Sequence, residues 1–196
     1  EGASIMAIDD ALLDFGMPMG PLRLLDEVGL DVARHAAQSM YEALGERLRP
    51  PPPIVALEGT GLLGKKGGRG FYTYAGDDKT TGPNDDLASK LGVAASNKHD
   101  DLTPSVIRAR AVLAMINEAA RVLADDIADR PSTVDLGMIM GAGFPPFRGG
   151  LLRHADSMGI STVVTRLEEF ALAYGPRFAP APLLRDLALS GRGFYT

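Results

Sequence analysis

Gly68-Arg69-Gly70-Phe71-Tyr72-Thr73 occurs twice in this 196-residue chain, the second time as residues 191–196. Related segments precede each copy: residues 15–21, FGMPMGP, precede the first, and residues 143–150, GFPPFRGG, precede the second. Each set also contains two aspartates at matching places, Asp9 and Asp26 in the first set and Asp135 and Asp156 in the second. Motifs that recur in the same order and at similar spacing indicate an internal duplication. The sequence therefore predicts two homologous units in tandem.

The stretch between the two units is polar and rich in turn-forming residues. Residues 76–86 read GDDKTTGPNDD and contain no large apolar side chain. Such a composition is typical of a linker, because it cannot bury an apolar face. We therefore expect a first unit at residues 1–74, a linker at residues 75–104 and a second unit at residues 105–196.

Both units have the apolar periodicity of helices. Apolar residues return every three or four positions, as on one face of an amphipathic helix, at Ile5, Ile8, Leu12 and Phe15 and again at Val112, Met115, Ile116 and Ala119. Asp31, Ser132 and Ser161 are expected to cap further helices. Only residues 71–74 suggest a short extended segment. The predicted fold class is all-α.

Composition excludes several functions. The chain has no cysteine, which rules out disulfides, thiolate nucleophiles and cysteine zinc sites. A net charge of −5 argues against a nucleic-acid partner. No run of 18 apolar residues is present, so we expect no membrane span. The chain starts at Glu1 without a leader, and we expect it to be part of a longer, cytoplasmic protein.

Residues 15–31 and residues 64–72 resemble the C-terminal domain of L-3-hydroxyacyl-CoA dehydrogenases. Residues 143–150, together with Asn117-Glu118-Ala119, resemble the second copy of that domain in bacterial multifunctional fatty-acid oxidation proteins. The resemblance covers nearly the whole chain outside the linker. It implies a helical fold like the C-terminal part of 6-phosphogluconate dehydrogenase, with no Rossmann domain in this chain.

The resemblance also implies a reaction. Family members oxidise a 3-hydroxyacyl-CoA to the 3-ketoacyl-CoA with NAD, using a His–Glu pair on a preceding Rossmann domain and an assisting Asn on the first helix of the first unit. None of these groups matches a position in residues 1–196. We therefore expect no catalytic, cofactor-binding or metal-binding residue here, and we expect the chain alone to be inactive.

The family resemblance further implies the partners. These are the acyl-CoA substrate, the Rossmann domain of the longer protein and a thiolase subunit. In simpler members the single helical unit dimerises, and an internal second unit would replace that partner. The chain alone is therefore expected to be a monomer.

Two groups of residues are candidates for contact with the substrate. Met17, Pro18, Met19, Gly20 and Pro21 suit one wall of an acyl cleft, because methionine adapts to a variable chain. A helix–helix corner that only packs would use the same residue types. Lys65, Lys66 and Arg69 suit the phosphates of coenzyme A, with a solvated loop as the alternative. The second unit has Ala188-Leu189-Ser190 in place of the lysines, so the shared GRGFYT is expected to be structural.

Other tempting residues have simpler interpretations. His154 and Asp156 are two positions apart, so their side chains would diverge on a helix. His35 reads as a solvated residue, and His99 lies in the linker. Residues 59–64, GTGLLG, contain a G-x-G-x-x-G string but lack the strand–helix context of a dinucleotide site. Two alternative functions of the whole chain remain. One is a scaffold that touches no substrate, and the other is the helical domain of another NAD(P)-dependent hydroxyacid dehydrogenase.

Overall fold

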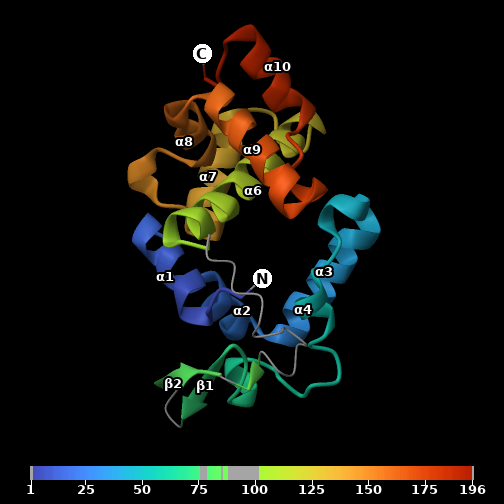
Figure 1. Cartoon of the computed structure of the whole chain (residues 1–196), viewed down its shortest axis with the longest axis vertical. Helices are drawn as coiled ribbons and strands as arrows, with labels where there is room; N and C mark the ends of the chain where they lie inside the picture. The colour runs from blue at the N-terminus through green and yellow to red at the C-terminus, as the bar shows by residue number, and fades with distance from the viewer. Residues whose placement is uncertain (1, 76–78, 85, 88–101, 196) are drawn as a thin grey trace. The chain divides into compact units, whose positions relative to one another are not determined.

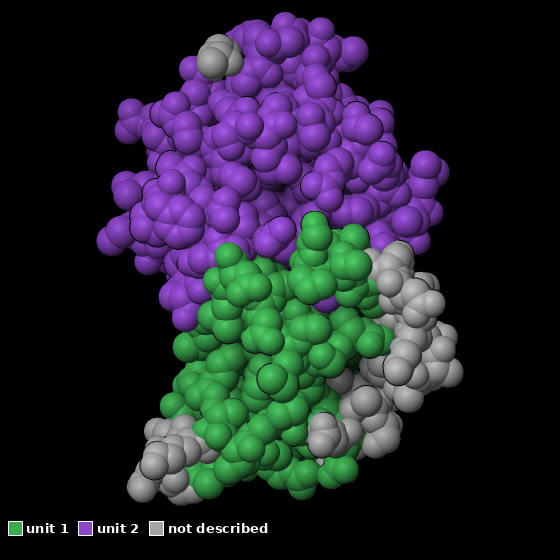
Figure 2. All heavy atoms as spheres, turned by 60° about the vertical axis from the view of Figure 1, so that its left-hand side comes forward, with its two compact units in different colours: residues 1–14, 19–106 green, residues 15–18, 107–196 purple. Residues whose placement is uncertain are grey.

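The computed structural model describes residues 2–75, 79–84, 86–87 and 102–195 (Figure 1). The chain divides into two compact units (Figure 2). Unit 1 comprises residues 1–14 and 19–106, and unit 2 comprises residues 15–18 and 107–196. Helices dominate both units, which confirms the predicted all-α class, and the described residues contain a single two-stranded sheet.

Unit 1 begins with three helices. They are α1 (Ile5–Phe15), α2 (Pro21–Val28) and α3 (Leu30–Leu44), followed by η1 (Gly45–Leu48), α4 (Pro52–Val55), η2 (Lys65–Gly67), β1 (Tyr72–Ala75) and β2 (Lys79–Pro83). Pro21 starts α2 at a position where its missing N–H has no helical partner. Gly29 separates α2 from α3 with a φ of 102°, which few other residues adopt.

In unit 2, α7, α8 and α9 repeat the succession of α1, α2 and α3, and one long helix precedes them. Its elements are α6 (Pro104–Ala124), α7 (Pro131–Ala142), η4 (Pro146–Arg148), α8 (Leu151–Met158), α9 (Ile160–Tyr174), η5 (Pro176–Phe178) and α10 (Pro182–Ser190). Gly159 separates α8 from α9 at a φ of 81°, as Gly29 does in unit 1. Gly191 ends α10 in the left-handed conformation, as its place after the apolar stripe predicts.

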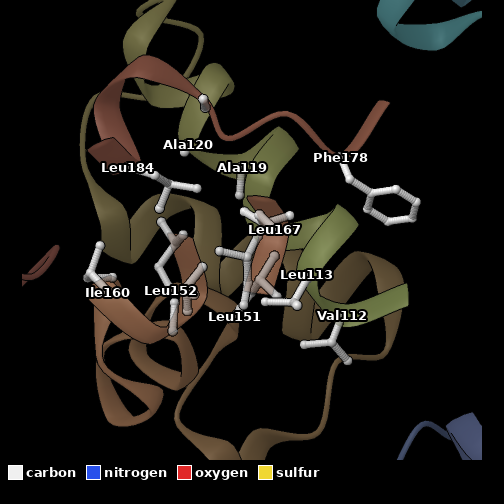
Figure 3. Packing of buried hydrophobic residues seen from close by; sticks show 14 of the residues in the cluster. Val112, Leu113, Ala119, Ala120, Leu151, Leu152, Ile160, Leu167, Phe178 and Leu184 are labelled. Carbon is white, nitrogen blue, oxygen red and sulfur yellow. The ribbon is translucent and has the colours of Figure 1, made fainter. Parts of the chain in front are cut away.

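The two units differ in the size of their cores. In unit 2, side chains from α6, α8, α9 and α10 point into a common interior, among them Leu113, Leu152, Leu167 and Leu184 (Figure 3), each 0% exposed. Unit 1 has a smaller buried cluster built from Leu30, Leu57, Leu62, Phe71 and Leu87.

The stretch expected to be a linker contains part of the fold of unit 1. Strand β2 pairs with β1 in an antiparallel hairpin, with Tyr72 opposite Pro83. Beyond it, the side chain of Asn84 donates to the carbonyl of Gly70 at 2.8 Å, and Leu87 is 2% exposed. These contacts form because the return strand satisfies backbone groups that β1 would otherwise leave unpaired. His99 lies outside the described residues.

The expected helix caps are wrong. The residue before α3 is Gly29, before α7 Arg130 and before α9 Gly159, and none provides a side-chain cap. Asp31 and Ser161 instead lie in the first turn of α3 and α9, because the sharp glycine turns start these helices earlier than the capping rule predicts.

Candidate functional site

A buried carboxylate fixes the corner between α1 and α2. Asp9 on α1 is 3% exposed, and its two oxygens accept hydrogen bonds from the backbone N–H groups of Leu22 at 2.8 Å and Arg23 at 3.0 Å. These N–H groups at the start of α2 have no partner within the helix. The hydroxyl of Tyr72 donates to the same carboxylate at 2.8 Å. Asp9 therefore holds the start of α2 and the GRGFYT segment together.

A second carboxylate holds GRGFYT against α2. Asp26 is 0% exposed and accepts from the backbone N–H groups of Phe71 and Tyr72 and from the hydroxyl of Tyr74, each at 2.8 Å. Burial raises the pKa of Asp26, although these hydrogen bonds oppose the rise. A Cβ on Gly70 would overlap the Asp26 carboxylate, which explains the glycine at this place in the repeat.

Unit 2 repeats both arrangements. Asp135 accepts from Leu152 N–H at 2.6 Å, Arg153 N–H at 3.1 Å and the Tyr195 hydroxyl at 2.6 Å. Asp156 accepts from the N–H groups of Phe194 at 2.8 Å and Tyr195 at 3.0 Å. We call the four aspartates, two in each unit, the carboxylate clamps. They give the repeated GRGFYT the structural role expected of it.

The structure divides the candidate corner residues between the two units. Met17 and Pro18 belong to unit 2, where Met17 packs against the buried cluster, and residues 19–21 belong to unit 1. Met19 is half-buried, Gly20 is buried against Asp9, and Pro21 starts α2. The side chain of Pro18 is exposed. The Asp9 clamp thus fixes the backbone of residues 20–23. It does not enclose a pocket around them.

Each candidate cation of the basic loop has an acidic partner. Lys65 Nζ lies 3.0 Å from Glu27, Lys66 Nζ lies 2.6 Å from Asp31, and Arg69 lies 3.1 Å from Asp86. The hydrogen bond from Lys65 lowers the pKa of Glu27, and that from Lys66 lowers the pKa of Asp31. Ion pairs near the protein surface contribute little stability.

A hollow beside this loop was not anticipated from the sequence. Apolar side chains and a charged rim form it, with lining residues Leu30, Asp31, Arg34, Leu57, Glu58, Gly59, Gly61, Leu62 and Leu63. Arg34 pairs with Glu58 across 3.4 Å at the rim. Gly59 and Gly61 both have a φ of 72°, so the glycines of the GTGLLG string serve turns. The string leads into the short η2 turn instead of a helix, which excludes a dinucleotide loop here.

His154 does not pair with Asp156. Its ring packs against those of Phe15 and Phe144, with centroids 5.4 and 6.2 Å away, while Asp156 binds the backbone of Phe194. Burial and the nearby Arg148 guanidinium lower the pKa of His154. The same Arg148 donates two hydrogen bonds to the carbonyl of Phe15, at 3.0 and 2.9 Å. This cluster attaches residues 15–18 to unit 2.

We expect His154 to make unit 2 less stable as the pH falls. Its pKa is lower in the folded state than in the unfolded state, so below about pH 6.5 the unfolded chain binds the proton more readily. Replacement with leucine, the residue that unit 1 has at the equivalent Leu24, should flatten the pH dependence of urea unfolding between about pH 7 and pH 5. Equal slopes for H154L and the original chain would contradict this expectation. H35L, at an exposed histidine, is the control.

Asn117 lies in the segment that resembles the family's Asn-Glu motif, but its amide is used inside unit 2. It is 1% exposed, donates to the carbonyl of Ala179 at 2.9 Å and accepts from the N–H of Ala181 at 2.7 Å. Its role in this unit is to hold the segment that leads into α10.

In the described part of the chain, no three His, Asp or Glu side chains could together hold a metal ion. Nor does any described helix have the length and apolar character to cross a membrane.

Comparison with known proteins decides the family. The model of the C-terminal domain of 3-hydroxyacyl-CoA dehydrogenase matches residues 1–74 and 107–193. The chain belongs to this family. This membership rules out the alternative that the chain is the helical domain of an unrelated hydroxyacid dehydrogenase.

Longer bacterial proteins are similar to this chain over nearly all of its length. The chain is 42% identical to the fatty acid oxidation complex subunit alpha of Vibrio parahaemolyticus over 97% of its length, and 39% identical to that of Shewanella sp. strain MR-4 over 100%. It spans only 26% and 28% of those relatives.

A solved structure confirms the fold. The 3-hydroxybutyryl-CoA dehydrogenase of Escherichia coli K12 matches with a TM-score of 0.75 and 25% identity, over 97% of this chain and 55% of that one.

Proposed function

We propose that the chain is the C-terminal helical part of an NAD-dependent 3-hydroxyacyl-CoA dehydrogenase of fatty-acid β-oxidation. The observation that carries the proposal is the family match over both units, combined with relatives named as subunits of the fatty acid oxidation complex. The reaction would be the oxidation of a 3-hydroxyacyl-CoA to the 3-ketoacyl-CoA. NAD would accept the hydride on a Rossmann domain of the longer protein, where the His–Glu pair would also lie.

The part of this chain in that reaction would be to bind and orient the acyl-CoA. The clamp at Asp9 holds the backbone at the start of α2. The acyl chain would lie along the neighbouring residues Met17, Pro18, Met19, Gly20 and Pro21. Lys65, Lys66 and Arg69 would exchange their acidic partners for the phosphates of coenzyme A. A thiolase subunit as a further partner, a cytoplasmic location and a monomeric state of this chain are parts of the same proposal.

The alternative is a scaffold that touches no substrate. The pairing of Lys65 with Glu27 and of Lys66 with Asp31 favours it, because these contacts need no ligand to satisfy the lysines. In that case the repeated helical units would only present packing surfaces to the neighbouring domains.

Calorimetric titration distinguishes these functions. The chain is titrated with acetoacetyl-CoA and separately with NAD, and a dehydrogenase assay is run alongside. We expect acyl-CoA binding without NAD binding or turnover. The double variant K65Q/K66Q should weaken acyl-CoA binding about tenfold, as expected for two lost phosphate contacts. R185Q removes a surface charge in unit 2 that pairs with Glu168 at 3.5 Å, and it should change nothing.

The other outcomes are equally informative. Heat from neither ligand would favour the scaffold. Turnover by the chain alone would mean that the catalytic groups lie within it, and the proposal would then be wrong.

A further inference from the structure

The corner motif of unit 2 places an aromatic ring in solvent. Phe147 lies in η4, between α7 and α8, and is 74% exposed, although phenylalanine is among the residues most often buried in folded proteins. Contacts on part of the ring hold it in place. A Cβ on Gly16 would lie 2.6 Å from its Cζ atom, and the Arg148 guanidinium lies 5.3 Å from its centroid. The rest of the ring is open to a ligand.

Phe147 is the counterpart of Met17 in the internal repeat. Gly20 and Gly150 are equivalent positions, because a Cβ on either would overlap a clamp aspartate of its own unit. Met17 and Phe147 each lie three positions before these glycines. The corner that is a candidate for acyl contact in the first copy therefore has a second copy, with a larger apolar side chain at the same place.

The two equivalent positions lie close together within unit 2. The ring of Phe147 lies against Gly16, the residue before Met17, and a Cβ on Gly143 would lie 2.7 Å from Pro18 Cγ. Gly16 and Gly143 have φ angles of 111° and 69°, which few other residues adopt, and their lack of a side chain permits these approaches. Met17, Pro18 and Phe147 thus adjoin one another, and we call these three residues the paired corner.

We propose that Phe147 extends the acyl surface of Met17 and Pro18, and that it makes the paired corner select 3-hydroxyacyl-CoA substrates whose alkyl chains are longer than that of acetoacetyl-CoA. The inference rests on the proposed function and deepens it by naming the substrate class. Phe147 contacts the outer part of the alkyl chain and takes no part in the oxidation itself.

The chemistry of the alkyl chain explains the selection. A chain gains affinity with every methylene group that it removes from water, and a phenyl ring offers a broad apolar surface for this purpose. The acetoacetyl group has a single methyl group beyond its keto carbon, so it has little to place on Phe147. A decanoyl chain carries a long apolar tail that can cover the ring.

The size of the paired corner favours an alkyl chain over a protein as its occupant. A stable protein interface covers about 800 Å² on each partner, which takes 20 or so residues. The paired corner has three apolar side chains, of which Met17 is partly buried in the core of unit 2. An alkyl chain is narrow enough to be covered by a surface of this size.

Two ligands of different chain length test the inference. The chain and its F147A variant are titrated calorimetrically with acetoacetyl-CoA and with 3-ketodecanoyl-CoA. We expect the original chain to bind the longer ligand more tightly. F147A should lower the affinity for 3-ketodecanoyl-CoA about tenfold more than the affinity for acetoacetyl-CoA. F147L keeps an apolar side chain and should retain most of the preference.

Controls separate a contact with the ligand from an effect on the fold. L172A removes an apolar side chain on α9 that is 92% exposed, and it should leave the affinities for both ligands unchanged. The midpoint of urea unfolding should change little in F147A, because most of the ring lies in solvent. Nuclear Overhauser effects between the terminal methyl group of the decanoyl chain and the ring protons of Phe147 would report the contact directly.

Three results would overturn the inference. Equal loss of affinity for the two ligands in F147A would mean that Phe147 acts only through the fold. Acyl-CoA binding with an unchanged chain-length preference in F147A would leave the proposed function standing and would assign the exposed ring to another partner. Absence of binding of both ligands to the original chain would contradict the proposed function, and this role of Phe147 would be excluded with it.

Discussion

Replacing Asp135 with alanine should lower the free energy of unfolding of unit 2 by about 3–5 kcal/mol, which approaches the whole stability of many domains. The carboxylate is 4% exposed and accepts hydrogen bonds from Leu152 N–H, Arg153 N–H and the Tyr195 hydroxyl. The variant leaves all three donors without their acceptor, and that of Leu152 is buried. Urea unfolding followed by circular dichroism measures the loss.

Two companion variants show whether the clamp causes the loss. D135N keeps the shape and one acceptor oxygen, so it should lose less stability than D135A. D129A removes an exposed carboxylate that accepts from the Thr133 hydroxyl at 2.6 Å, and it should change the unfolding midpoint little. A D135A chain as stable as the original would show that the three donors find other partners.

The second large effect is expected at Gly150, where alanine should lower stability by about 3 kcal/mol or more. Gly150 has a φ of 118°, a conformation that L side chains rarely adopt, and a Cβ there would overlap the carboxylate of Asp135. The substitution therefore strains the backbone and displaces the clamp at the same time. Thermal and urea unfolding of the purified variant measure the effect.

Two other glycines separate strain from overlap. Gly175 has a φ of 99° but open space around its Cβ position, so G175A should lose only about 1 kcal/mol from strain. Gly137 lies within α7, also in open space, and G137A should stabilise the helix by about 0.5–1 kcal/mol. If G150A and G175A lost the same amount, overlap with Asp135 would not matter.

Periodicity and repetition were enough to predict the helices and the duplication. The stripe from Ile5 to Phe15 coincides with α1, and Gly191 ends α10 where expected. The helix starts at Leu30 and Ile160 were missed because positive-φ glycines, and not side-chain caps, determine them. The return of β2 onto β1 was missed because its stability comes from Asn84 and Leu87, which a polar composition hides.

The clamps were visible in the sequence only as repeated aspartates. Asp9 and Asp135 recur at matching places, but nothing local indicates that they bind the start of the next helix. The division of the corner between units was equally hidden, because it depends on Arg148 reaching the carbonyl of Phe15. The proposed contacts of residues 17–21 and of Lys65, Lys66 and Arg69 with acyl-CoA stay predictions.

The attachment of residues 15–18 to unit 2 has a consequence for dissecting this protein. A polypeptide cut at the segment between the two units would lose Phe15, whose ring lies 5.6 Å from that of Phe144 and 5.4 Å from that of His154. Unit 2 expressed from residue 105 onward would therefore expose an aromatic surface that is buried in the uncut chain. A unit 2 polypeptide that begins at the repeat boundary should therefore be prone to aggregation. A polypeptide that also keeps residues 15–18 should not.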